Sequence, residues 1–112
     1  MAIDDWPAVD TLRDALGDAA RARPNAASRL RAALVGCQSF LDKELFPALR
    51  DSVAGSDAVC IRDMQLRATG LYHACATSLP DTQDPELLLA RSAQYLAYLT
   101  DEPLAMAERL LA

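Results

Sequence analysis

Residues 37–51 decide the fold of this chain, and they read CQSFLDKELFPALRD. Leucine recurs there at every fourth position: Leu41, Leu45 and Leu49. That spacing predicts an amphipathic helix. Pro47 lies inside the pattern, where it removes one backbone donor and crowds the preceding turn. We therefore expect one long helix from about residue 25 to residue 51 or slightly beyond, with a kink at Pro47.

Proline, glycine and capping residues divide the rest of the chain into three further helical segments. We expect these over residues 7–22, over residues 57–78 and from residue 85 to the C-terminus. Pro103 interrupts the last segment, so we expect a kink or a break there. The predicted inward stripes are Val9, Leu12, Leu16 and Ala19; Leu30, Leu34, Cys37, Leu41, Leu45 and Leu49; Cys60, Met64, Ala68, Leu71, Cys75 and Leu79; and Leu88, Ser92, Tyr95, Leu99, Glu102 and Met106.

Four amphipathic segments joined by short turns predict an all-α fold, an up-down-up-down four-helix bundle. The composition agrees, because aromatic residues make up only 5% of the chain and glycine occurs four times. Alanine and leucine, which are abundant here, are the best helix formers. A chain of 112 residues is long enough for one core. We expect residues 1–112 to form a single helical domain.

Charge and cysteine usage narrow the class of protein. The net charge of −5 argues against non-specific binding to nucleic acid, which needs a basic face. No apolar run is long enough for a membrane span, and no signal peptide is evident. The three cysteines form no CxxC pair, which suits free thiols in a reducing cytoplasm. We therefore expect a cytoplasmic protein that binds neither nucleic acid nor membrane.

The expected bundle brings a few reactive side chains to one level, because residues equidistant from a hairpin turn lie at the same height. The residues of this predicted core layer are Cys37, Leu71, Cys75 and Tyr95. His73 lies level with them but on the opposite side of its helix, so we expect it at the surface. Glu102 faces inward about two turns away.

A metal site needs three or four converging ligands, and the predicted layer offers two thiols and one phenol. We therefore expect no metal and no cofactor. If a metal is found, the candidate ligands are Cys37, Cys75, His73 and Glu102. Buried cysteine is most often a small core hydrophobe, and a redox role for Cys37 and Cys75 stays open.

Motifs of nucleophilic catalysis and of phosphate binding are absent from the sequence. A cysteine–histidine couple would require Cys75 and His73, which are two positions apart on one helix and do not face each other. We therefore expect that the protein is not an enzyme.

The segment 40–49 resembles the second helix of hemerythrin-like (HHE) four-helix proteins, which commonly reads HxxxEExxLFPxL. Aligning its FP with Phe46-Pro47 places Cys37 at the histidine and Leu41 and Asp42 at the two acids. Residues 104–111, LAMAERLL, are similar to the end of the fourth helix of that family. This second alignment places Tyr95 at a histidine and Leu99 at an acid.

The resemblance implies a bundle with a di-iron or similar centre, yet the ligands of that centre are missing here. The positions of the former ligands carry Cys37, Leu41, Met64 (or Ala68), Tyr95 and Leu99. Oxygen binding and iron carriage therefore do not carry over, and the resemblance implies a hemerythrin-like core filled with apolar side chains.

The leading functional hypothesis is a non-catalytic protein that acts through protein contacts, as a homodimer or an adaptor. Several large apolar residues lie beside the stripes and either widen the core or form an interface patch: Trp6, Phe40, Phe46, Tyr72, Leu87, Leu89 and Tyr98. One alternative is a degenerate hemerythrin relative that binds a metal or a small molecule through Cys37, Cys75, Met64, Tyr95 or Glu102. A second alternative is histidine phosphotransfer by His73, although the usual following lysine and glycine are absent.

Overall fold

A computed structural model describes residues 6–53, 55–77 and 85–111, and within these ranges it contains helices and no strand. Its elements are α1 (Pro7–Ala20), α2 (Ala26–Phe40), the π-helix η1 (Leu41–Leu45), α3 (Phe46–Ser52), α4 (Ser56–Thr77), α5 (Pro85–Asp101) and α6 (Pro103–Leu110). Since α2, η1 and α3 follow one another directly, and one residue separates α5 from α6, these elements make four helical segments. The predicted all-α class and the four segments are confirmed.

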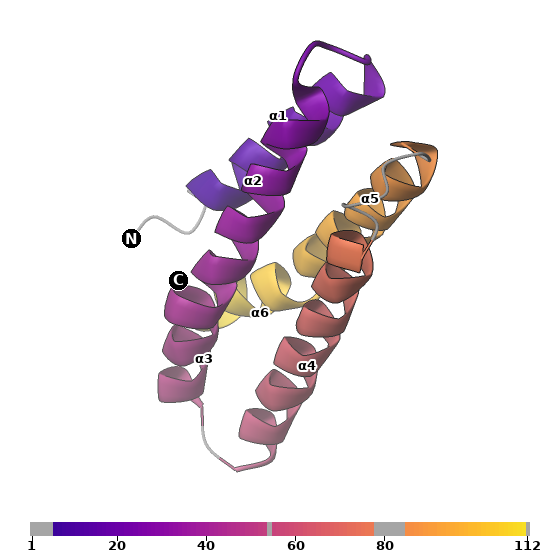
Figure 1. The fold of residues 1–112 in the computed structure, drawn as a ribbon. Coiled ribbons are helices and arrows are strands. Elements are labelled where there is room, and N and C mark those ends of the chain that lie inside the picture. The colour runs from indigo at the N-terminus through magenta and orange to yellow at the C-terminus, as the bar shows by residue number, and fades with distance from the viewer. Residues whose placement is uncertain (1–5, 54, 78–84, 112) are drawn as a thin grey trace.

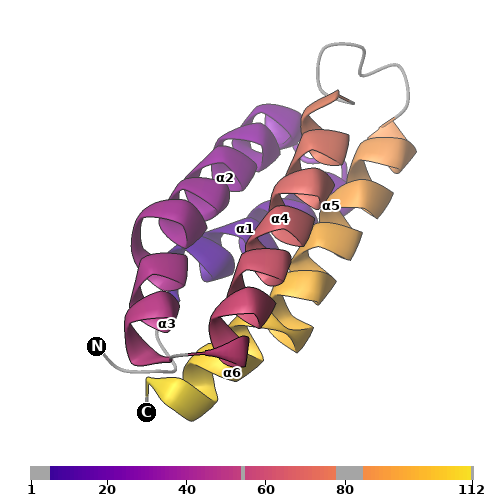
Figure 2. The same cartoon turned by 90° about the horizontal axis from the view of Figure 1, so that it is seen from below.

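The four segments surround one core. Helix α1 packs against α2 and α5, and α4 packs against α5 and α2, so each segment contacts at least two others. Figures 1 and 2 show α1 beside α2 and α4 beside α5. The short α6 contacts both α5 and α3. The molecule is elongated, with principal extents of 45, 26 and 20 Å.

The reversal between α1 and α2 is made by two residues with left-handed backbone. Ala22 has φ 53° and Asn25 has φ 60°. Asparagine adopts this region more readily than most residues, whereas alanine pays a steric penalty there. Helix α1 ends at Ala20, just before Arg23-Pro24, where proline disfavours helical backbone at the preceding residue. The predicted end of the first helix near residue 22 therefore has a local cause.

The irregularity expected at Pro47 takes the form of the π-helix η1 immediately before it. The backbone N–H of Phe46 donates to the carbonyl of Leu41, five residues earlier. A wider turn gives the Pro47 ring room beside the carbonyl of the preceding turn, with which it would clash in a regular helix. The π-turn also keeps the leucines of this segment on the buried face of the helix. From Cys37 to Leu49 the buried positions advance by three steps of four residues, which drift around a regular helix of 3.6 residues per turn, and the π-turn offsets that drift.

The core contains most of the predicted stripes. All six inward positions of the second segment are buried: Leu30, Leu34, Cys37, Leu41, Leu45 and Leu49. Two predictions are wrong. Cys60 is exposed, and Ile61 is buried in its place, in step with Met64 and Ala68. Glu102 is also exposed, because α5 ends at Asp101 and Pro103 turns inward to begin α6. Leu79 lies outside the described residues.

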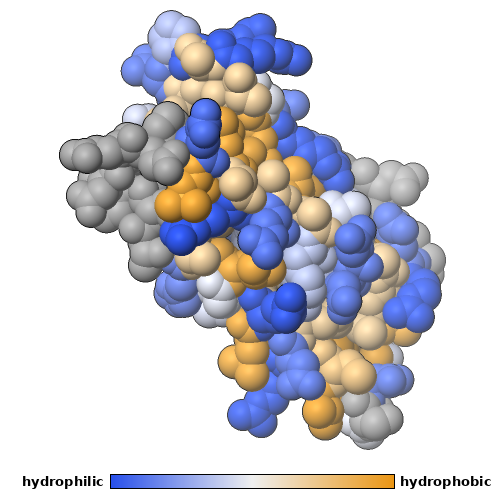
Figure 3. Space-filling view, turned by 90° about the vertical axis from the view of Figure 1, so that its right-hand side faces the viewer, coloured by the Kyte–Doolittle hydropathy of each residue, from blue (hydrophilic) through white to orange (hydrophobic). Residues whose placement is uncertain are grey.

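The large apolar side chains beside the stripes mostly widen the core. Trp6 and Phe46 are buried, while Phe40, Tyr72, Leu89 and Tyr98 pack partly buried against the core. Leu87 is the exception, with 41% of its surface exposed. On the side that carries α4 and α5, the hydrophobic surface is broken up by hydrophilic side chains (Figure 3).

None of the helices, as far as they are described, has both the length and the apolar character that a transmembrane span requires.

Candidate functional site

A buried polar group lies in the middle of the core, at the predicted layer. Tyr95 is fully buried, and its hydroxyl donates a hydrogen bond of 2.7 Å to Oε1 of Gln38. The thiol of Cys37 lies beside the same hydroxyl and is also fully buried. Cys75 lies near Tyr95 from α4. The structure thus brings together the Cys37, Cys75 and Tyr95 side chains that the hairpin geometry predicts at one level, and it adds Gln38.

Gln38 connects this buried group to the surface. Its Nε2 donates to Oγ1 of Thr69 at 3.3 Å and to the Asp42 carboxylate at 3.3 and 3.4 Å. Gln65 donates to the same carboxylate at 3.2 Å and accepts a 2.7 Å hydrogen bond from Arg50. The chain of hydrogen bonds therefore joins α5, α2, η1, α4 and α3. Because every amide is satisfied, it fixes how these helices sit against one another.

The thiols in the centre are held in their protonated form. Burial raises the pKa of Cys37 from 9.0 to about 11, and the contact with the Tyr95 hydroxyl opposes this only partly. Burial also raises the pKa of Cys75, against the smaller effects of Ser92 and of the Arg91 charge. Burial, followed by the neighbouring Cys37 and Cys75, raises the pKa of Tyr95 as well. Since the thiolate is the nucleophile and the metal ligand, neither role is favoured at neutral pH.

Ser92 completes the centre from α5. Its hydroxyl is fully buried and has no hydrogen-bond partner of good geometry in the described part of the chain. It lies beside the Cys75 thiol, which is a weak donor and acceptor. Such a pair is weakly polar and fits a packed core better than a reactive site.

Thiol labelling checks this description. With a disulfide reagent at pH 7.5, we expect one cysteine of the native protein to react within minutes and all three to react in denaturant, because Cys60 is exposed while Cys37 and Cys75 are buried. In Cys60→Ser, rapid labelling of the native protein should disappear. Rapid labelling of a second thiol in native Cys60→Ser would contradict the buried placement of Cys37 and Cys75.

The remaining candidate ligands do not join this centre. His73 is exposed, and its ring contacts that of Tyr72 at 5.7 Å between centroids. Glu102 is exposed at the junction of α5 and α6. Within residues 6–53, 55–77 and 85–111, no three histidine, cysteine or acidic side chains come together as a metal site would require. The candidate set of Cys37, Cys75, His73 and Glu102 is therefore not assembled in this structure.

The positions at which the resemblance places former metal ligands carry buried side chains. Cys37, Leu41, Tyr95 and Leu99 have no exposed surface, and Met64 has 7%. Leu71 is only partly buried, at the edge of the layer. Packing of this kind leaves no open coordination position at the centre of the bundle.

Sequence reasoning missed Gln38, which is the hub of the polar group. The signal was present in the spacing. Gln38 lies four positions after Leu34 and three before Leu41, so it shares their face of the helix. A polar side chain at such a position must find a buried partner, and Tyr95 is the polar residue that faces it.

A second feature is a groove on the surface between α1 and α2. It consists of two adjoining hollows with volumes of about 470 and 490 Å³. Ala8 and Gly36 line both hollows and therefore join them. The first is lined by Ala8, Thr11, Asp14, Ala15, Asp18, Arg29, Ala32, Ala33, Gly36 and Cys37, and the second by Pro7, Ala8, Gly36, Ser39, Phe40, Lys43 and Glu44. The floor is made of small side chains, and charged side chains from both helices line it as well: Asp14, Asp18 and Arg29 in the first hollow, and Lys43 and Glu44 in the second.

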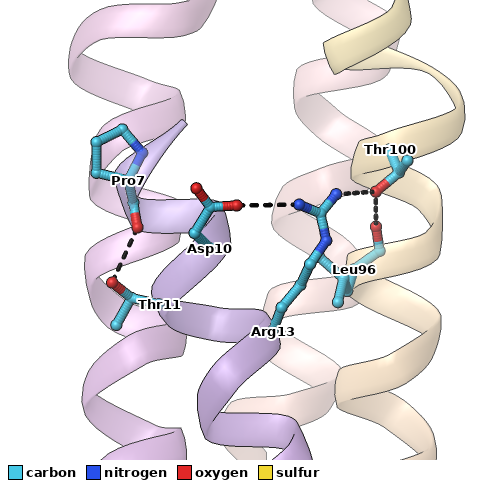
Figure 4. A network of polar contacts seen from close by, with 6 residues as sticks. All are labelled: Pro7, Asp10, Thr11, Arg13, Leu96 and Thr100. Carbon is cyan, nitrogen blue, oxygen red and sulfur yellow. Dashed lines mark hydrogen bonds and ion pairs between the residues drawn. The ribbon is translucent and has the colours of Figure 1, made fainter. Parts of the chain in front are cut away.

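Polar contacts of α1 lie beside the groove. Arg13 pairs with Asp10 of the same helix at 3.1 Å and donates to Thr100 of α5 at 3.5 Å, while Thr100 also donates to the carbonyl of Leu96 (Figure 4). The hydroxyl of Thr11 donates to the carbonyl of Pro7 at 2.9 Å. Thr11 therefore presents mainly its methyl group to a molecule in the groove.

Gly36 on the groove floor is not explained by packing within the chain. It lies in the middle of α2 and is exposed, and a Cβ added there would meet no atom within 4 Å. Glycine inside a helix costs about 1 kcal/mol relative to alanine. Gly70 on α4 shares this property, so Gly36 indicates a surface for close approach of another backbone only together with the two hollows that it lines.

Comparison with known protein families, with curated proteins and with solved structures finds no match in any of the three. The resemblance to hemerythrin-like proteins accordingly stays a prediction from the sequence.

Proposed function

We propose that this protein is a non-catalytic helical bundle that acts by binding protein in the groove between α1 and α2. The observation that carries the proposal is the floor of that groove, where exposed Gly36 leaves open space above a mid-helix backbone. Small residues on a helix allow a second helix to approach closely, as at many helix–helix contacts. The groove therefore fits a helix better than a loop or a strand.

The buried centre supports a role without catalysis. Its thiols are protonated at neutral pH, because burial raises the pKa of Cys37 and of Cys75. Its amide and phenol groups bond to one another and fix the packing. Groups that are satisfied and enclosed in this way stabilise a scaffold and offer no reactive atom to a substrate.

We also propose how the four helical segments are arranged. The four segments form an up-down-up-down, hemerythrin-like bundle with apolar side chains in place of the metal centre, and the chain changes direction at Pro103. Burial of Leu41 and Leu99 supports the filled centre, and the start of α6 at Pro103 supports the change of direction. Three free cysteines suit a reducing compartment, so we place the protein in the cytoplasm.

Affinity capture from extracts of the source cells tests the groove. Gly36→Glu places a carboxylate on the groove floor, and Gly70→Glu is the matched control. Gly70 is also an exposed helical glycine with room for a Cβ, but it lies on α4. We expect Gly36→Glu to capture at least ten times less protein than the wild type does. Gly70→Glu should capture as much protein as the wild type. Equal capture by both variants would show that the groove is not the binding surface.

A further inference from the structure

We infer that Asp42, an exposed residue of η1, is a positioning residue that sets the direction of the hydrogen bonds ending on buried Tyr95. Its carboxylate acts through Gln38, which bonds to both residues. Loss of the Asp42 charge then reverses these bonds without breaking the chain that they form. This role of Asp42 is independent of protein binding in the groove between α1 and α2.

The outer end of this hydrogen-bond chain has a fixed direction. The Arg50 guanidinium can only donate, and it donates to Oε1 of Gln65 at 2.7 Å. Gln65 must therefore present its Nε2 to Asp42, at 3.2 Å from Oδ1. The ionised Asp42 carboxylate can only accept. Gln38 must therefore also present its Nε2 to Asp42, and it does so at 3.3 Å from Oδ2.

The inner end of the chain could run in either direction by itself, because an amide and a hydroxyl each contain a donor and an acceptor. In the structure, Nε2 of Gln38 donates to Oγ1 of Thr69 at 3.3 Å, and Oε1 accepts from the Tyr95 hydroxyl at 2.7 Å. If the Gln38 amide turned over, Thr69 would donate to Oε1 and Nε2 would donate to Tyr95. The Asp42 carboxylate opposes this second arrangement, because Oε1 would then face two acceptor oxygens.

The direction of the chain decides how the Cys37 thiol can bond. The thiol lies beside the Tyr95 hydroxyl, and both side chains are fully buried. Gln38 accepts the one proton of that hydroxyl, so the thiol can bond to the hydroxyl only as a donor. In the reversed chain the hydroxyl proton is free to bond to the Cys37 sulfur, which favours the thiolate. A surface charge thereby acts on a buried thiol.

Asp42→Asn distinguishes the two directions, since it replaces one acceptor oxygen with a donor. Gln65, held by Arg50, still needs an acceptor, so we expect the oxygen of the new amide at the Oδ1 position. Its nitrogen then takes the Oδ2 position, 3.3 Å from Nε2 of Gln38. Two donors face each other there unless the Gln38 amide turns over. We expect that it turns over and that Tyr95 becomes an acceptor.

Raman spectroscopy of the full chain measures the direction at Tyr95. The ratio of the higher-frequency to the lower-frequency band of the tyrosine ring doublet rises when a phenol changes from hydrogen-bond donor to acceptor. A Tyr72→Phe/Tyr98→Phe background leaves Tyr95 as the only tyrosine of the chain. In that background the ratio should rise in Asp42→Asn. It should stay unchanged in Glu44→Gln, the matched control, which neutralises another exposed carboxylate of η1.

A second substitution tests the part that Gln65 plays. Gln65→Leu removes the amide that orients the side chain at position 42, so in Asp42→Asn/Gln65→Leu the oxygen is free to face Gln38. We expect the ratio to return toward its starting value. Circular dichroism should show folded helix in these variants, since Asp42 is exposed and Gln65 is half-buried. An unchanged ratio in Asp42→Asn overturns the inference, as does an equal rise in Glu44→Gln or a rise that Gln65→Leu does not reduce.

The route through Gln38 has its own test. In Gln38→Leu the Tyr95 hydroxyl has lost its acceptor, so adding Asp42→Asn should change the ratio no further. A further change as large as the one in the presence of Gln38 would mean that Asp42 reaches Tyr95 by another route. The positioning role assigned to Asp42 would then be wrong.

Discussion

Tyr95→Ala is expected to lower the free energy of unfolding by about 3–5 kcal/mol, the range for removing a buried aromatic side chain. Tyr95 heads the fully buried side chains by volume, and its ring contacts that of Tyr72 at 6.3 Å between centroids. Its hydroxyl also supplies the hydrogen bond to Oε1 of buried Gln38. The alanine variant thus loses packing and leaves a buried acceptor without its donor. Urea denaturation followed by circular dichroism measures the change.

Two control variants divide this effect into its parts. Tyr95→Phe keeps the ring and removes the donor, so we expect a loss of about 1–3 kcal/mol. Tyr98→Ala removes a tyrosine three positions along α5 that is partly exposed and lies under Arg67 at 5.6 Å. It should cost less than Tyr95→Ala. Equal losses from Tyr95→Ala and Tyr98→Ala would mean that Tyr95 is not the central packing residue of the bundle.

Alkaline pH is expected to destabilise the fold well before general denaturation by base. The pKa of Cys37 is raised from 9.0 to about 11 in the folded state, so the unfolded chain releases this proton first. The stability contributed by the protonated thiol is therefore fully present below pH 9 and is lost as the pH rises through 11. For Cys37 alone the loss reaches about 2–3 kcal/mol. Cys75 and Tyr95, whose pKa values are also raised, act in the same direction.

Denaturant titrations at intervals between pH 7 and 11 measure this dependence. Cys37→Ala lowers stability at every pH by leaving a cavity, but its stability should fall less steeply above pH 9 than that of the wild type. Cys60→Ser, which changes an exposed thiol, should keep the wild-type slope. If Cys37→Ala and the wild type lose stability in parallel up to pH 11, the Cys37 thiol does not resist ionisation in the folded protein.

Much of the fold could be predicted from the sequence, because the apolar spacing and the prolines act locally. Pro7 and Pro85 begin helices, and Leu30 to Leu49 point inward at every predicted step. The inward placement of Glu102 was wrong because the prediction continued the periodicity of one helix past Asp101. The helix ends there, and a new one begins at Pro103. The inward placement of Cys60 was wrong because the step of four was carried back from Met64 to the first turns of α4, where the buried stripe passes through Ile61.

The candidate site was less predictable, since it depends on which side chains meet between helices. Hairpin geometry placed Cys37, Cys75 and Tyr95 at one height. The spacing of Gln38 from Leu34 and Leu41 puts it on the buried face of its helix, but it does not show that Tyr95 is the side chain it meets. The groove between α1 and α2 could not be predicted from the sequence either. It arises where small residues of two helices coincide, and the sequence shows each of those residues only as a helix former.

The π-helix η1 has a consequence for how the length of this chain can change. A π-turn holds one residue more than the regular turn it replaces. Loss of one exposed residue there, such as Lys43, would convert η1 to regular helix and keep the core faces of α2 and α3 aligned. The ring of Pro47 would then crowd the carbonyl one turn before it. Among homologues, a one-residue deletion within 41–45 is therefore expected to occur together with replacement of Pro47, and each change alone should be rare.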